Sequence, residues 1–216
     1  MRTVSDIYRE YRIMPSLALH QLRVAAVAET VCDRCSQAVD ASTAVTACLF
    51  HDMGNIIKSE LSYFPEFLEP EGLTYWEGVK AEFIQKYGSN EHEATLAIAD
   101  ELGLPRAVRD VVEKIGFSKL EEVEQSGSTE TMICEYADMR VGPLGVLSMA
   151  DRLEEGRIRY SNKKDKLLFD PQFYDRLSDA LYRIEARLFS GASIRPEDIT
   201  DSGIEPLIGA LRSKEL

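Results

Sequence analysis

Apolar residues recur at spacings of three and four positions along almost the whole chain, and no stretch alternates apolar and polar residues in the manner of a strand. The first pattern places apolar side chains on one face of an α-helix, whereas a half-buried strand requires the second. Of the 216 residues, 44% are hydrophobic, which is enough to form a buried core. The sequence therefore predicts an all-α globular protein, and its length favours a single domain.

Residues typical of helix starts and helix ends divide this pattern into segments. A short helix is expected from about Val4 to Tyr11, and a second begins at Pro15, a favoured first residue of a helix. An apolar helix over about 42–52 is followed by Gly54 and Asn55, which we expect to form a left-handed cap. Loops are expected over 65–72 and 124–128, and further helices over about 75–87, 91–103, 105–114, 131–140, 147–160, 171–189 and 206–211.

The net charge of -12 at pH 7 restricts the partners of the protein. A strongly acidic chain lacks the basic surface that binds long nucleic acids or anionic membranes. A small phosphorylated molecule stays compatible with this charge, because a bound cation and a few arginines dominate the field at close range. No apolar run reaches the length of a membrane span, and the polar N-terminus does not resemble a signal peptide, so we expect a cytoplasmic protein.

Four cysteines are too few for a disulfide framework in a chain of this size. Cys32 and Cys35 form a single CxxC motif, which also occurs in zinc and redox sites. The motif lies in the helical run VAAVAETVCDRC and has no second CxxC to pair with. We therefore expect these cysteines to pack against other helices rather than to carry chemistry.

The chain has only three histidines, His20, His51 and His92, and all three fall in expected helices. In ACLFHDMGN an apolar helix ends with His51 and Asp52 side by side. A divalent cation would satisfy a buried imidazole and a buried carboxylate together. The alternative is a histidine at a helix end beside an ordinary solvated aspartate, and the His-Asp pair alone does not decide between the two.

Four segments, YRIMPSLALHQLRVAAVAE, ACLFHDMGNIIK, NEHEATLAIADELGLP and EYADMRVG, resemble in this order the signature regions of the HD-domain metal-dependent phosphohydrolases. The resemblance spans about Tyr8 to Tyr160, and HDMGN is similar to the HDIG variant of the family motif. It implies an HD-domain helical bundle over residues 1–160. Residues 161–216 match no motif, and we expect a C-terminal helical extension that packs on the same domain or joins two subunits in a homodimer.

The resemblance also implies a metal site. Its ligands would be His20, His51, Asp52 and Asp138, which suit one divalent ion per chain, either Mn, Fe, Co, Ni, Zn or Mg. In family members with two metals, the position of His92 helps to hold the second ion together with histidines near the end of the next helix. Here that region reads VVEKIGFSKL and lacks histidine. We therefore expect one metal, with His92 as a phosphate-facing or proton-donating catalytic group, and a second-metal role for it stays open.

Other cationic residues could approach the site. Arg23 lies three residues after His20 and so shares its helix face, which suits either a clamp on a substrate phosphate or a surface ion pair. Lys58 and Arg140 lie close in sequence to the expected ligands, but a solvated surface position is favoured for both.

The resulting functional hypothesis is a metal-dependent hydrolase of phosphoester or pyrophosphate bonds in a small phosphorylated molecule, such as a nucleotide. One alternative is an HD scaffold that binds a metal or ligand without turnover. Another is a di-iron HD oxygenase, which needs more ligands than this sequence offers. The segment from Leu61 to Trp76 is a candidate lid, or else a loop packed on its own aromatic residues.

Overall fold

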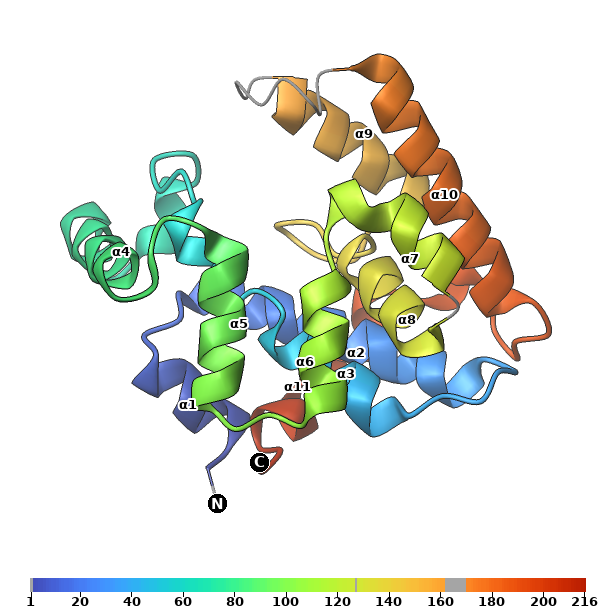
Figure 1. Cartoon of the computed structure of the whole chain (residues 1–216), viewed down its shortest axis with the longest axis horizontal. Coiled ribbons are helices and arrows are strands. Elements are labelled where there is room, and N and C mark those ends of the chain that lie inside the picture. The colour runs from blue at the N-terminus through green and yellow to red at the C-terminus, as the bar shows by residue number, and fades with distance from the viewer. Residues whose placement is uncertain (1, 127, 162–169) are drawn as a thin grey trace.

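The computed structural model describes residues 2–126, 128–161 and 170–216, and Figure 1 shows an assembly of packed helices. The all-α prediction is confirmed, because the described residues contain helices and two isolated bridges but no strand. The α-helices are α1 (Val4–Glu10), α2 (Pro15–Arg34), α3 (Ala41–Phe50), α4 (Leu73–Tyr87), α5 (Glu91–Glu101), α6 (Arg106–Lys114), α7 (Leu120–Ser126), α8 (Thr129–Asp138), α9 (Met149–Ser161), α10 (Pro171–Phe189) and α11 (Asp201–Arg212). Four short 3-10 helices join them: η1 (Asn55–Ile57), η2 (Pro65–Leu68), η3 (Phe117–Lys119) and η4 (Pro196–Asp198).

Helices α2, α3 and α8 form the centre of the molecule and pack on one another. Every residue of α3 from Thr43 to Phe50 is buried, which explains why its sequence is apolar on all sides rather than on one. Helix α6 covers α3, while α10 lies on α7 and α8. The three central helices are therefore held from several sides, and residues at their ends are placed rigidly.

The C-terminal part of the chain is built into the same core. Tyr174 and Leu181 of α10 and Ile204 of α11 belong to one continuous cluster of buried side chains with the central helices. Helix α11 packs on α2, and the two ends of the chain meet through backbone hydrogen bonds of 3.0 Å from Val4 to Lys214 and 3.1 Å from Leu216 to Arg2. The division expected between residues 160 and 161 falls at the end of α9, and residues 162–169, which follow it, lie outside the described part.

Two expected segment boundaries were wrong. The loop expected over 124–128 begins too early, because α7 continues to Ser126 with Leu120 and Val123 buried one helical turn apart. The last helix was expected to start at about Pro206 but begins at Asp201, where the hydroxyl of Thr200 accepts a hydrogen bond from the N–H of Gly203 and caps the helix.

The expected left-handed cap after α3 was also wrong. Gly54 has φ -90° and ψ 0°, a backbone conformation open to other residues. Its lack of a side chain is needed for packing: a Cβ atom at this position would lie 2.3 Å from the carbonyl oxygen of Glu91 and 2.8 Å from the Cβ of Ala94. A glycine therefore lets the turn after α3 touch α5 directly.

Candidate metal centre

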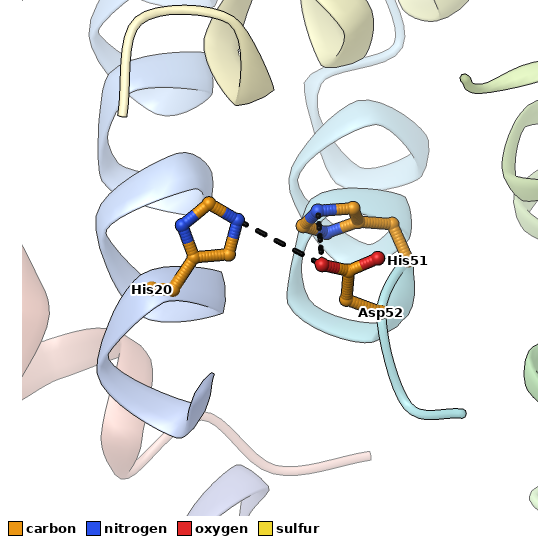
Figure 2. Close-up of side chains that lie close together, drawn as sticks. All are labelled: His20, His51 and Asp52. Atoms are coloured by element: carbon orange, nitrogen blue, oxygen red, sulfur yellow. Dashed lines mark ion pairs between the residues drawn. The ribbon is translucent and has the colours of Figure 1, made fainter. Parts of the chain in front are cut away.

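Three central helices bring the four expected ligands together. His20 lies on the second turn of α2, and His51 is the residue that ends α3, with Asp52 directly after it. Asp138 is the last residue of α8. Figure 2 shows dashed lines from one carboxylate oxygen of Asp52 to the imidazoles of both His20 and His51.

The side-chain atoms converge on one small volume. Nε2 of His20 lies 3.0 Å from Oδ1 of Asp138 and 3.9 Å from Oδ2 of Asp52. Nε2 of His51 lies 3.4 Å and 3.7 Å from the same two oxygens. One ligand atom each of His20, His51 and Asp52 lie within 4.8 Å of one another, a spacing that suits atoms bound to a common ion.

The hydrogen bonds of His51 test whether the residues fit a metal. Its Nδ1 lies 2.7 Å from the carbonyl oxygen of Cys48 and donates to it, so in the neutral ring the lone pair is on Nε2. This Nε2 atom is buried and makes no hydrogen bond among the described residues, although two carboxylate oxygens face it. A cation bound between the imidazoles and carboxylates would satisfy all of these groups, and the mixed nitrogen and oxygen donors suit a divalent transition metal.

Charge is concentrated at the same place. Burial alone would lower the pKa of His51, but the carboxylates of Asp52 and Asp138 outweigh burial and raise this pKa to about 10. Burial would raise the pKa of Asp138, but the imidazoles of His20 and His51 hold it well below its usual value. Without a metal, a proton on His51 therefore compensates the two carboxylates, and a bound cation would take over that role.

Two further residues orient Asp52, and sequence reasoning missed both. The fully buried Gln21 accepts a hydrogen bond of 3.2 Å from the backbone N–H of Asp52 through its side-chain oxygen. The amide nitrogen of Asn55 donates to Oδ2 of Asp52 over 2.6 Å. A glutamine next to His20, within a mainly apolar part of α2, was the available sequence signal, since polar groups that become buried need partners.

Glu135 is a third buried residue that the sequence did not single out. It lies one turn before Asp138 and is completely buried, with Oε2 accepting a 2.7 Å hydrogen bond from the N–H of Gly116 and Oε1 making none among the described residues. Burial, followed by the charge of Asp138, raises the pKa of Glu135 to about 7. A carboxyl group able to exchange a proton near neutral pH thus lies one helical turn from an expected ligand.

His92 is not a member of the convergent group. It lies in the first turn of α5, where its Nε2 is 3.0 Å from the carbonyl oxygen of Glu113 and 3.2 Å from Nζ of Lys119. Burial, and then the positive charge of Lys119, lower the pKa of His92. Nε2 of His92 thus lies against the end of α6, with the ammonium group of Lys119 beside it. A metal ion bound to this nitrogen would have to displace Lys119.

The expected cationic residues differ in position. Arg23 lies on α2 near His20, with its Nε 3.9 Å from Oδ1 of Asp201. Lys58 lies at the surface and pairs with Glu91 over 3.4 Å. Arg140 is only 3% exposed, so the surface position favoured for it was wrong, because its guanidinium binds backbone oxygens of the C-terminal segment.

Comparison with known protein families gives a match. A family model described as HD domain matches residues 17–156, which is more than half of the chain and includes all four convergent residues. No curated protein and no solved structure shows significant similarity to the chain. None of the helices in the described ranges is both long enough and apolar enough to cross a membrane.

Proposed function

The chain belongs to the HD-domain family, and from this premise we propose that it is a metal-dependent hydrolase of phosphoester or pyrophosphate bonds in a small phosphorylated molecule such as a nucleotide. Most members of this superfamily are metal-dependent phosphohydrolases, and HD domains bind divalent metals. The observation that carries the proposal is the meeting of His20, His51, Asp52 and Asp138 from three separate helices.

In the proposed reaction, His20, His51, Asp52 and Asp138 hold one divalent ion. Such an ion supplies Lewis-acid chemistry, activating a water molecule for attack and polarising the phosphorus centre. Asn55 and Gln21 keep Asp52 fixed, so that the site does not reorganise during the reaction.

The other residues of the site bind substrate and handle protons. The guanidinium of Arg23, on the same helix as His20, binds a phosphate oxygen of the substrate. The imidazole of His92, held at Nε2 by α6, faces the substrate phosphate or donates a proton to the leaving oxygen. The net charge of -12 supports a small substrate over a long nucleic acid, because an extended phosphate backbone would meet repulsion beyond the site.

Purified protein loaded with Mn, Co or Ni and screened against phosphorylated metabolites tests the proposal. We expect hydrolysis of at least one compound and its loss in the double variant His51→Ala with Asp52→Ala. Asp33→Ala, which removes an exposed carboxylate from the last turn of α2, is the matched control and should keep full activity.

Three outcomes would contradict this function. Hydrolysis that survives in the double variant would exclude the proposed site. Stoichiometric metal without turnover of any compound would indicate a binding scaffold. Two irons per chain would indicate an oxygenase, since the proposed hydrolase has one ion.

A further inference from the structure

The segment from η4 through α11 lies outside the residues that match the HD family, yet it packs on α2, one of the helices that carry the expected ligands. Helix α11 packs along α2, the helix that carries His20 and Arg23. In Figure 2 the reddish ribbon of this C-terminal region passes beside the α2 ribbon near His20. A segment that is not part of the family domain therefore contacts the helix that carries one of the expected ligands.

Arg140 anchors the beginning of this segment. Its guanidinium donates to the backbone oxygens of Pro196 at 3.1 Å and Ile199 at 3.2 Å, and also to the hydroxyl of Tyr136. Its Nε donates to the carbonyl oxygen of Leu147 over 2.5 Å. Because Arg140 follows Asp138 by two residues, the end of α8 and the start of the C-terminal segment are held as one unit.

Asp201, the first residue of α11, makes the second connection. Both of its carboxylate oxygens face the N–H of Val146, at 3.1 Å and 3.2 Å. Gly145 approaches so closely that a Cβ atom there would lie 2.6 Å from Oδ2 of Asp201. The carboxylate of Asp201 thus accepts a hydrogen bond from the loop that follows Asp138 and packs closely against it.

The same carboxylate faces Arg23. Oδ1 of Asp201 lies 3.9 Å from Nε of Arg23, whose side chain is 20% exposed. Among the described residues, the two terminal nitrogens of Arg23 make no hydrogen bond. Asp201 therefore approaches the guanidinium at Nε. The terminal nitrogens, which can bind phosphate in bidentate contacts, stay without a hydrogen-bond acceptor among the described residues.

We propose that Asp201 positions Arg23 to bind a phosphate group of the substrate, so that a residue outside the family domain completes the substrate site. The inference rests on the proposed function for its substrate class. A carboxylate at Nε restricts the rotation of a long side chain, and a guanidinium held in advance loses less conformational entropy when an anion binds. Asp201 is a positioning residue, because it acts through Arg23.

A double-mutant cycle on metal-loaded protein tests this coupling, with inorganic phosphate as the probe and titration calorimetry as the measurement. Arg23→Ala removes a charge-assisted contact, and we expect phosphate affinity to fall roughly tenfold to a hundredfold. Asp201→Asn keeps an oxygen that accepts from Val146 but removes the charge beside Arg23, and we expect a loss of about threefold to tenfold. The double variant should bind phosphate no more weakly than Arg23→Ala alone.

Two controls separate positioning from folding. Asp198→Asn removes another carboxylate from the same segment, one that binds Arg195 and not Arg23, and it should leave phosphate affinity unchanged. In an Arg23→Lys background, which retains charge but has no Nε, Asp201→Asn should have no further effect. Metal content and the thermal unfolding midpoint of each variant show whether the fold is intact.

Additive losses in the cycle, or full phosphate affinity in Asp201→Asn, would overturn the inference even if the protein is a hydrolase. Absence of phosphate binding by the wild-type protein would also overturn it. If the losses of phosphate affinity in the Arg23 and Asp201 variants are coupled but the protein hydrolyses no compound, the phosphate subsite is supported and the proposed function is rejected. The two hypotheses can therefore fail separately.

Discussion

Nε2 of His20 lies 3.0 Å from Oδ1 of Asp138, although 118 positions separate the two residues in the sequence. This contact joins α2 to α8 within the proposed metal centre. The aspartate at the end of α8 is thus closer to each of the two imidazoles than the aspartate of the His-Asp pair.

The role of Asp138 leads to a first prediction. Asp138→Asn removes an anionic donor while keeping the size of the side chain, and we expect the affinity for Mn or Co to fall by more than about a hundredfold. Metal content after dialysis, measured by mass spectrometry, should drop from one ion per chain to almost none. The exposed Asp33→Asn is the control, and a full ion in the Asp138 variant would exclude this residue as a ligand.

The close approach of Gly54 to α5 leads to a second prediction. Gly54→Ala places a methyl group against the backbone oxygen of Glu91, and we expect a loss of about 1–3 kcal/mol in the free energy of unfolding. Gly78→Ala is the opposite case, because Gly78 lies inside α4 with open space around it, and we expect a gain of about 0.5–1 kcal/mol. Urea denaturation measures both changes. Equal effects of the two variants would contradict the packing argument.

Glu135 makes the stability of the metal-free protein depend on pH. Burial and Asp138 raise its pKa from 4.5 to about 7 in the folded state, so the folded protein holds this proton more tightly than the unfolded chain. The stabilising effect of protonation is complete below pH 4.5 and is lost as the pH rises through 7.

Glu135→Gln should remove this dependence while keeping an acceptor for the N–H of Gly116. We expect the variant to gain stability over the wild type as the pH rises from 5 to 8, reaching a difference of about 3 kcal/mol. Denaturation in the presence of a chelator at several pH values measures this difference. A difference that does not change with pH would show that Glu135 has an ordinary pKa.

Arg140 leads to a prediction about the C-terminal segment. Arg140→Ala leaves several backbone oxygens without their donor, and we expect a loss of about 3–5 kcal/mol in the free energy of unfolding. Limited proteolysis should cut the segment around Pro196 faster than in the wild type. Arg106→Ala, which removes a guanidinium that is 92% exposed on α6, should change neither quantity.

Some residues of the site could be expected from the sequence because their signals are local. The His51-Asp52 pair ends an apolar helix, and His20 lies on a periodic one, so their positions follow from patterns within a few turns of chain. The order of the four segments supplied the remaining ligand, Asp138, through family resemblance.

Other properties could not be expected, because each depends on a distant segment. The sequence indicated a surface position for Arg140. Its side chain is buried because it donates hydrogen bonds to backbone oxygens of Pro196 and Ile199, which are distant in the sequence. The sequence indicated a helix cap at Gly54. A glycine is required there because residues of α5 lie too close for a side chain. The anchoring of His92 to Glu113 depends on how α5 packs against α6.

The helical class of this protein and the chemical types of its expected ligands could be predicted from the amino-acid sequence, because periodicity and side-chain chemistry are properties of short segments. Which charged groups lie close together depends on the packing of the helices. Burial raises the pKa of Glu135, and the packing of α11 on α2 brings Asp201 to Arg23. Both effects depend on distances between segments far apart in the chain, and such distances exist only after the helices have packed.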